Sequence, residues 1–329
     1  MSISVTELVA AALDPGWADH HPQRHSLIVD LEGPPELEAE DFSALDGWLA
    51  ALPIPVIGMG GVNDFLAASM DVLVQTDAEL QAVVAGIAAN PEAAAVLVQV
   101  LRSSETLDPI QALTLESLGY ATLQAGSEFA AWLRDRRQRK AARMVDPGAD
   151  VVLIERSEES LELILNSPET RNSLSAAMRD GLTEAFRLVA MDAGIHTVNV
   201  SANGPSFSAG GDLEEFGLVN DPVTAHRTRM LRMPARYLVP AADRYRFHVH
   251  GACIGAGIEL PAFAGHLSAA ADTFFRLPEI AMGLIPGAGG CVSIPRRIGR
   301  QRTALMAISG RDLDAAQALE WGLIDAIEG

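Results

Sequence analysis

Cysteine, aromatic residues and long apolar runs are all scarce in this 329-residue sequence. The only cysteines are Cys253 and Cys291, which argues against a disulfide framework and fits a reducing compartment. No apolar run of about 18 residues occurs, so a membrane-spanning helix is not predicted. The first residues carry Glu7 and Asp14 and do not match the pattern of a secretory signal peptide. We therefore expect a cytoplasmic protein.

Positive charge is scarce as well. The sequence has 24 lysines and arginines against 43 acidic residues, a net charge of −19. Nucleic acid is therefore not expected as a main partner, because phosphate recognition needs a basic surface. A single anionic ligand held by a local basic patch stays compatible with this charge. Hydrophobic residues make up 49% of the sequence, which predicts a globular protein with a sizeable core. The length favours one large domain with a smaller one.

The first half of the sequence is patterned mainly for helices. Short strands are predicted at 27–31 and 54–58, and a helix lies between them at 41–52. Four further helices are expected from about residues 77, 91, 109 and 127, with Asp77 as the N-cap candidate of the first. The basic run at 134–140 is either a solvated helix end or a phosphate contact. Asp146-Pro147-Gly148 marks the expected junction between an N-terminal domain, 1–147, and a second domain, 148–329.

The second half alternates strands with helices. A hairpin is predicted from 151–155 and 161–165, a helix from 172 to 187, and further strands at 197–200, 248–249 and 267–271. This alternation is typical of an α/β domain with a largely parallel sheet. Ligands of such sheets lie at the carboxyl ends of the strands.

Two glycine-rich segments follow predicted strands and are the strongest chemical signal. They are residues 203–212 (NGPSFSAGGD) and 247–260 (FHVHGACIGAGIEL). Small residues let the backbone approach a ligand closely and present its N–H groups. A lone Gly-Gly-Asp turn is usually only a tight turn, but two such turns can each offer one N–H to the same oxygen, as in an oxyanion hole. Glu259 lies just inside the following helix, where it would face the same ligand.

Together with residues 278–290 (PEIAMGLIPGAGG), the segments 206–212 (SFSAGGD) and 251–260 (GACIGAGIEL) resemble the crotonase superfamily, also called the enoyl-CoA hydratase/isomerase family. The resemblance covers roughly residues 150–329, about half of the chain. It implies a crotonase-like (ClpP/crotonase) α/β fold with a mainly helical N-terminal domain added to it. It leaves the reaction open, because members of the family catalyse hydration, isomerisation, hydrolysis, decarboxylation and C–C bond chemistry.

The resemblance also implies roles for individual residues. The two N–H donors of the oxyanion hole fall on Gly211 and Ala256, where Ala256 replaces the commoner glycine. The two glutamates of the hydratases of this family are matched by Glu259 and Glu279. Coenzyme A, as part of the substrate, would be contacted by Arg171, Ser208, Ala209 and Gly210. No metal and no covalently bound cofactor is implied.

The retention of both glutamates favours addition or removal of water. Attack on an α,β-unsaturated thioester moves negative charge onto its oxygen, where two N–H donors stabilise it. The attacking water loses a proton and the α-carbon gains one, and two carboxyl groups can divide these tasks. We therefore hypothesise an enoyl-CoA hydratase, a lyase that also catalyses the reverse dehydration of a 3-hydroxyacyl-CoA. The alternatives are an enoyl-CoA isomerase, an acyl-CoA thioester hydrolase and a non-catalytic acyl-CoA-binding subunit.

Several nearby residues have plainer interpretations. Glu279 could instead cap a helix, Asp212 is expected to be an N-cap, and His250 and His266 are expected to be structural. The same holds for the arginines at 296, 297, 300 and 302. Residues 216–243 are expected to form a mobile lid.

The chain departs from the family pattern at its two ends. The sequence stops at residue 329, where the family usually continues into helices that close the acyl pocket and build a trimer. Residues 73–134 resemble those helices but stand at the front of the chain. Either the chain is permuted, or residues 25–140 are a degenerate second copy without its own active site; the predicted strands slightly favour the second. The resemblance implies a homo-oligomer, a trimer or a hexamer.

Overall fold

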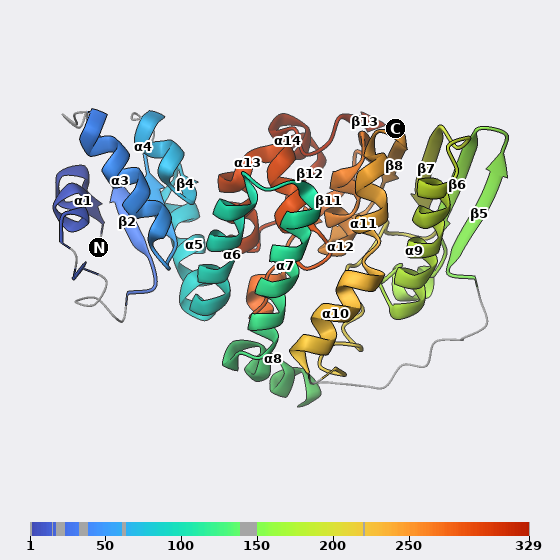
Figure 1. Ribbon diagram of the computed structural model, residues 1–329, viewed down its shortest axis with the longest axis horizontal. Coiled ribbons are helices and arrows are strands. Elements are labelled where there is room, and N and C mark those ends of the chain that lie inside the picture. Colours follow the sequence, from blue (N-terminus) through green and yellow to red (C-terminus); the bar gives the residue numbers. More distant parts are fainter. Residues whose placement is uncertain are drawn as a thin grey trace.

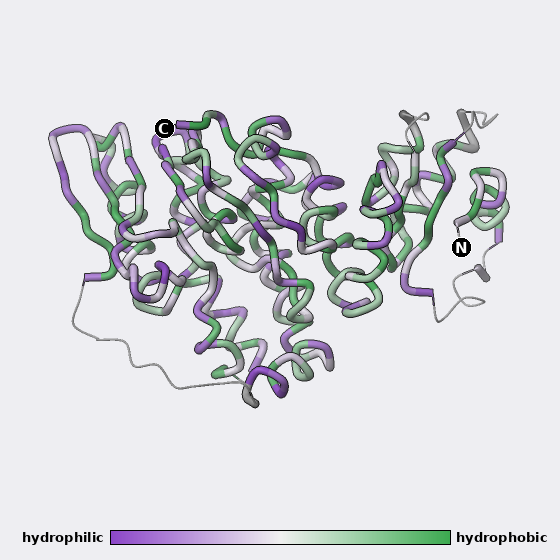
Figure 2. The backbone as a smooth tube through the Cα atoms, turned by 180° about the vertical axis from the view of Figure 1, so that it is seen from behind, coloured by the Kyte–Doolittle hydropathy of each residue, from purple (hydrophilic) through white to green (hydrophobic). Residues whose placement is uncertain are grey.

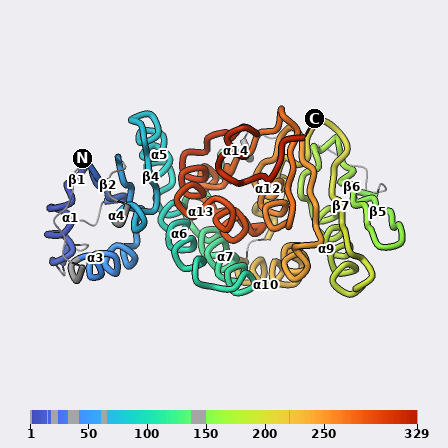
Figure 3. The backbone as a smooth tube through the Cα atoms, turned by 90° about the horizontal axis from the view of Figure 1, so that it is seen from above, coloured from blue at the N-terminus to red at the C-terminus, as the bar shows by residue number. Residues whose placement is uncertain are grey.

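The fold was analysed in a computed structural model, which describes residues 2–14, 16–17, 24–32, 39–60, 64–138, 150–219 and 221–328. The expected domain junction at Asp146-Pro147-Gly148 lies outside these residues. A small N-terminal layer forms one end of the molecule, and the hairpin of strands β5 (Val152–Ser157) and β6 (Ser160–Leu165) forms the other (Figure 1). Helices from both halves of the sequence fill the space between these two ends (Figures 1 and 3).

The N-terminal layer is a four-stranded parallel sheet with helices packed on it. The strands lie in the order β1 (Ile3–Ser4), β2 (Leu27–Asp30), β3 (Val56–Met59) and β4 (Val72–Val74), and the helices are α1 (Val5–Ala12), α3 (Ala39–Ala51) and α4 (Asp64–Ser69). A separate apolar core, which includes Leu8, Leu27 and Leu49, holds the layer together. The predicted strands and the helix between them are confirmed, whereas β1 and β4 were not predicted.

The four helices that follow are α5 (Asp77–Ala89), α6 (Pro91–Ser104), α7 (Pro109–Gln124) and α8 (Ser127–Gln138), as the sequence predicts. The expected cap of α5 is wrong by one residue. Thr76, not Asp77, is the N-cap, and its side chain accepts the N–H of Glu79. Thr76 has the extended backbone that an N-cap needs, and Asp77 is already helical with its charge at the positive end of the helix.

Helices α5, α6 and α7 pack on α13 (Gly290–Ser309), a helix near the other end of the chain. Figures 1 and 3 show α13 beside α5 and α6. Gly86 of α5 lies so close to the carbonyl of Ile308 that no side chain would fit there. Val83, Leu97 and Leu113 belong to the same apolar core as Met306. The helices at the front of the chain are therefore part of the main body, not of the N-terminal layer.

The second half is built on two sheets. The larger has the order β13 (Ala326–Glu328), β10 (His266–Ala270), β8 (Tyr245–Val249), β7 (Thr197–Ala202), β6 (Ser160–Leu165) and β5 (Val152–Ser157), and all its pairs are parallel except the β5–β6 hairpin. The smaller joins β12 (Leu313–Asp314), β11 (Phe274–Arg276) and β9 (Ala252–Ile254). The predicted α/β domain with a largely parallel sheet is confirmed. In Figure 2 the outer hairpin is hydrophilic at its tip, where β5 is exposed.

The remaining helices lie around these sheets, and three of them also line a cavity. They are α9 (Ala176–Met191), α10 (Pro222–Arg232), α11 (Ala235–Leu238), α12 (Ala256–Glu259) and α14 (Ala315–Trp321), with 3-10 turns η1 (Pro168–Thr170), η2 (Val239–Arg244), η3 (Pro261–Phe263) and η4 (Glu279–Met282). The helix predicted from residue 172 begins four residues later, because Arg171 and Asn172 have left-handed backbone with φ of 55° and 51°. Pro261 begins a 3-10 turn and does not interrupt a helix.

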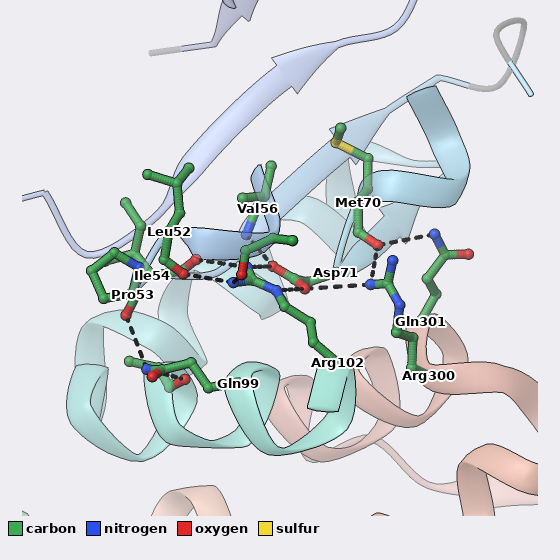
Figure 4. Close-up of polar contacts among 12 residues, drawn as sticks. Leu52, Pro53, Ile54, Val56, Met70, Asp71, Gln99, Arg102, Arg300 and Gln301 are labelled. Carbon is green, nitrogen blue, oxygen red and sulfur yellow. Dashed lines mark hydrogen bonds and ion pairs between the residues drawn. The ribbon is translucent and has the colours of Figure 1, made fainter. Parts of the chain in front are cut away.

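A buried charge cluster fastens the N-terminal layer to the main body (Figure 4). Asp71, 2% exposed, stands at the start of β4 and accepts two hydrogen bonds from the guanidinium of Arg102 on α6, at 2.7 and 2.5 Å. Arg300 of α13 reaches the same carboxylate at 3.4 Å and donates to the carbonyl of Met70 at 2.6 Å. Arg102 also donates to the carbonyl of Leu52 at 2.6 Å. Three separate elements therefore meet at one carboxylate.

Within the described residues, no single helix is long and apolar enough to cross a membrane. Helices α5 and α6 are long and apolar enough only when taken together, and the chain bends by 110° between them.

Candidate active site

Backbone hydrogen bonds join the two glycine-rich segments side by side. The turn after β7 and the segment after β8 pair through Phe207 N–H to the His250 carbonyl at 2.8 Å and Ile254 N–H to the Ser208 carbonyl at 3.0 Å. Both segments leave the carboxyl ends of neighbouring parallel strands. The sequence predicted this meeting point, because adjacent parallel strands end at the same edge of a sheet.

A cavity of about 440 Å³ opens beside this junction. Its walls come from α7, α9, α10, the turn at 211–219, α12 and the segment 279–288. Four of the residues predicted for the reaction line it: Gly211, Ala256, Glu259 and Glu279. Residues up to 68 positions apart in the sequence therefore face one space.

Glu259 ends the short helix α12 and is 2% exposed. Its Oε2 accepts the N–H of Ala288 at 2.7 Å and the N–H of Gly290 at 2.9 Å. Burial raises the pKa of this carboxyl to about 7, although the backbone N–H groups act in the opposite direction. A carboxyl group with this pKa can both give up and take up a proton near neutral pH.

Glu279 begins the 3-10 turn η4 and presents a second carboxyl to the cavity. Its Oε2 is buried and has no hydrogen-bond partner within the described part of the chain. Burial, and next the charge of Glu259, raise its pKa well above the ordinary value of 4.5. The Oε1 atoms of both glutamates lie within 3.6 Å of the point where a Cβ of residue 255 would be. Gly255 therefore keeps open the space between the two carboxyls, and its φ of 50° also favours glycine.

Gly211 and Ala256, the residues predicted to supply the two backbone N–H donors, both line the cavity. Ala256 is the first residue of α12, so its N–H has no acceptor within the helix. Gly211 and Leu174 are partners in an isolated parallel β-bridge. The hydrogen bond recorded for this bridge runs from the N–H of Leu174 to the carbonyl of Gly210, at 2.7 Å, and so does not use the N–H of Gly211. Among the described residues, no hydrogen bond is recorded from either N–H group. The arrangement fits the predicted pair of donors.

The residues predicted to contact coenzyme A are placed differently. Ser208 is 2% exposed, and its hydroxyl donates to the Asn172 carbonyl at 2.8 Å and accepts the N–H of Gly210 at 3.2 Å. The N–H of Ala209 donates to the Arg171 carbonyl at 2.9 Å. These polar groups support the turn. Ser208, Ala209 and Gly210 do not line the cavity, and their contact with coenzyme A stays a prediction. The side chain of Arg171 is exposed, so its contact with coenzyme A stays a prediction.

Glu116 is a functional candidate that the sequence analysis missed. It lies on α7, is 0% exposed, and its two oxygens accept the N–H groups of Gly289 and Cys291, each at 2.8 Å. Burial, and next the charge of Glu259, raise its pKa well above the ordinary value. At the start of α13, Glu259 thus accepts the N–H groups of residues 288 and 290, and Glu116 accepts those of residues 289 and 291. The only signal in the sequence was an acid on the apolar face of α7, three residues after Leu113.

The aromatic part of this wall of the cavity comes from α7, at the front of the chain, and the basic part from α10. Tyr120 of α7 packs on Gly287, and the guanidinium of Arg229 from α10 lies 4.5 Å from the centre of its ring. Arg229 donates to the hydroxyl of Ser117 at 3.0 Å and to Gln124 Oε1 at 3.1 Å. Removal from water raises the pKa of Tyr120 and lowers that of Arg229. Both groups face the cavity in their ordinary charge states at neutral pH.

The plainer interpretations hold for most neighbouring residues. His250 bonds to the Gly204 carbonyl at 2.8 Å, and His266 lies 3.8 Å from the carboxylate of Asp325. Asp212 is not an N-cap, because no helix follows before residue 222; its carboxylate accepts the N–H of Glu214 in a turn. The four arginines of α13 bind carbonyl and carboxylate groups of the fold. In the basic run, Arg136 pairs with Glu214 at 2.9 Å.

The predicted lid contains α10 and α11, and its mobility stays a prediction. Met233 lines the cavity, whereas Leu231 is 66% exposed. Cys253 and Cys291 are free and buried, as expected. No group of three or more histidine, cysteine or acidic side chains could hold a metal ion in the described ranges.

The buried carboxyls predict an unusual dependence of stability on pH. The native state raises the pKa of Glu116, Glu259 and Glu279, so it binds more protons than the unfolded chain above about pH 4.5. The contribution of these protonated carboxyls to the free energy of unfolding is complete below that pH. It is lost as the pH rises through the native pKa, which is about 7 for Glu259. For Glu259 alone the loss is on the order of 3 kcal/mol.

We expect Glu259→Gln to remove part of this slope. Urea unfolding at several pH values between about 4.5 and 8 would measure it, with the exposed-site variant Glu162→Gln as control. Equal slopes for the wild type and Glu259→Gln would contradict the burial of a titrating carboxyl at this position.

Comparison with known proteins places this site in a family. Residues 155–328 match the family described as "Enoyl-CoA hydratase/isomerase". The chain is 32% identical to 2,3-dehydroadipyl-CoA hydratase from Escherichia coli (strain K12) over 181 residues, 54% of this chain and 68% of that protein. It is 30% identical to mevalonyl-coenzyme A hydratase sidH from Aspergillus fumigatus, covering 51% of this chain and 62% of that protein. Some relatives are therefore matched over less than two thirds of their length.

Solved structures agree with this fold. The enoyl-CoA hydratase from Thermoplasma volcanium GSS1 superposes with a TM-score of 0.50 at 29% identity, covering 55% of this chain and 72% of that one. The family match begins after α8, so Glu116 and Tyr120 lie outside it. The fold implied by the sequence resemblance is confirmed.

Proposed function

This chain belongs to the enoyl-CoA hydratase/isomerase family, the crotonase superfamily, and we propose that it adds water to an α,β-unsaturated acyl-CoA or catalyses the reverse dehydration. One observation carries the proposal. Glu259 and Glu279, two carboxyls whose pKa values are raised by burial, line the same cavity as Gly211 and Ala256, whose backbone N–H groups have no acceptor among the described residues. Two relatives whose names are those of acyl-CoA hydratases support it.

In the proposed mechanism the thioester oxygen binds between the N–H groups of Gly211 and Ala256. Negative charge gathers on that oxygen as water attacks the β-carbon, and each donor of this kind typically contributes about a hundred- to a thousandfold in rate. One carboxyl of the Glu259–Glu279 pair takes a proton from the water, and the other gives a proton to the α-carbon. Because the two groups interact, they titrate as a pair, and one ionised and one protonated carboxyl is the reactive state.

Alternative reactions use the same site differently. An isomerase needs a base that moves a proton between two carbons, and a thioester hydrolase directs water to the carbonyl carbon. The pair of carboxyls favours hydration over both, because water addition needs one proton removed and another delivered. A trimeric or hexameric assembly and the contact of Arg171 with coenzyme A are further parts of the proposal.

A panel of 2-enoyl-CoA thioesters incubated with the protein in D₂O tests the reaction. We expect products heavier by one water molecule, with deuterium at the α-carbon, identified by mass spectrometry. Products of unchanged skeleton mass would indicate an isomerase, and release of free coenzyme A a hydrolase. Either of these as the dominant outcome, or no conversion of any thioester, would contradict the proposed hydration.

A further inference from the structure

Arg229 is a cation in the cavity wall that no carboxylate neutralises. No ion pair of Arg229 is recorded among the described residues, whereas two other arginines of the same wall are paired: Arg179 with Glu215 at 2.8 Å and Arg232 with Asp180 at 2.7 Å. Removal from water lowers the pKa of Arg229, so the charge is held at a cost to stability.

The hydrogen bonds of Arg229 leave part of its guanidinium free. Its Nε donates to the Ser117 hydroxyl at 3.0 Å, one Nη to Gln124 Oε1 at 3.1 Å, and the other to the Ser117 carbonyl at 3.4 Å. A guanidinium has five N–H donors, so two remain. All three acceptors are neutral. A carboxylate placed at the two remaining donors would be bound by charge-assisted hydrogen bonds.

The nearest carboxyl does not serve as the counter-charge. Glu116 is close enough for its charge to act on Arg229, but both its oxygens bind the N–H groups of Gly289 and Cys291. Its burial also favours the uncharged form. The positive charge at this wall therefore stays uncompensated within the described chain.

Arg229 lies near the part of the cavity where the acyl group of the substrate would bind. Its guanidinium lies on the ring of Tyr120, which packs against Gly287, and the charges of Glu259 and Glu279 act on the same phenol. Arg229 is thus one side chain away from the carboxyls proposed for the reaction. The phosphates of coenzyme A are separated from the thioester by the whole pantetheine arm, so an anion bound here belongs to the acyl chain.

We propose that Arg229, with Gln124 and Tyr120 beside it, is a subsite for a carboxylate carried by the acyl group, so that the preferred substrates are CoA thioesters of dicarboxylic or similarly anionic acids. The inference rests on the proposed function and names its substrate class. A bound carboxylate supplies the counter-charge that Arg229 does not find among the described residues. A methyl-terminated chain at the same place would cover two N–H donors of this half-buried cation and leave them without acceptors, which is unfavourable.

Binding of saturated acyl-CoA ligands tests the subsite without requiring catalysis. Two ligands of equal chain length, one ending in a methyl group and one in a carboxylate, are compared by calorimetry over several lengths. We expect the wild type to bind the carboxylate ligand roughly 10- to 100-fold more tightly at the best length. Arg229→Met should abolish this preference, and Arg229→Lys should keep part of it. Arg232→Met is the matched control, because it lies on the same helix and wall but is paired, and it should keep the preference.

The outcomes separate the two proposals. Equal binding of both ligands by the wild type at every length would overturn the subsite, whatever the variants do. A folded Arg229→Met protein, judged by its thermal melting, that loses affinity for both ligands equally would also overturn it. A carboxylate preference without hydration in the enoyl-CoA panel would contradict only the proposed reaction. No binding of any CoA thioester would remove the proposed function and this inference with it.

Discussion

Replacing Glu279 by glutamine should lower kcat by roughly 10²- to 10⁴-fold while leaving the affinity for the CoA thioester nearly unchanged. The amide has almost the same shape as the carboxyl but can neither take up nor deliver the proton. The carboxyl also has no structural partner at Oε2 whose loss would disturb the site. Glu259→Gln should have an effect of the same size, and steady-state kinetics with an enoyl-CoA thioester would measure both.

A third glutamate of the same cluster provides the control. Glu116 is 0% exposed and its pKa is likewise raised well above the ordinary value, but it does not line the cavity. Glu116→Gln should therefore change kcat by roughly tenfold or less, because no proton moves through it. A loss for Glu116→Gln as large as that for Glu279→Gln would assign the effect to the charge of the cluster and not to proton transfer. Full activity of a Glu259→Gln, Glu279→Gln double variant would exclude the proposed roles outright.

Asp71→Ala should destabilise the protein by about 3–5 kcal/mol. The change leaves the guanidinium groups of Arg102 and Arg300, whose side chains are 11% and 12% exposed, without their shared carboxylate. It also removes the acceptor for the N–H of Val56 at 2.8 Å. Urea unfolding followed by circular dichroism would measure the change in the free energy of unfolding, provided that the transition is two-state.

The surface pair of Asp180 and Arg232 is the matched comparison for this effect. Its side chains are 47% and 61% exposed, so Asp180→Ala should cost only about 0–1 kcal/mol. A similar cost for both variants would show that the Asp71 cluster is not a desolvated anchor. A separate, earlier unfolding transition in Asp71→Ala would instead show that the N-terminal layer opens before the main body.

Local patterns predicted the elements that carry local signals. The β5–β6 hairpin, the helices from α5 to α8 and the two glycine-rich turns all rest on the spacing of apolar residues or on glycine within a short window. The strands β1 and β4 escaped prediction because they have only two and three residues. The helix expected after Asp212 is a turn, because the chain there runs along the cavity toward α10.

The residues of the candidate site also differ in whether a local pattern or only long-range packing brings them together. Glu259, Glu279, Gly211 and Ala256 could be predicted because each lies in a motif that shows its chemistry. The remaining wall could not, since Tyr120 and Arg229 meet only through the packing of α7 on α10, 109 residues apart. The hydrogen bonds of Asn172 likewise depend on distant contacts, because its side chain joins a backbone group of its own loop, at Ser167, to two in the turn after β7, at Asn203 and Ser206.

The hydrogen bonds from Gly289 and Cys291 to Glu116 join residues 173 and 175 positions apart. During synthesis, the apolar faces of α5, α6 and α7 leave the ribosome long before α13, the helix that covers them. Loops of this length close slowly, and surfaces left exposed meanwhile favour aggregation. The order of the helices along the chain therefore delays the packing of α5, α6 and α7 until α13 has been synthesised. The cavity itself is complete only after residues 279–288, its latest segment in the sequence, have been made.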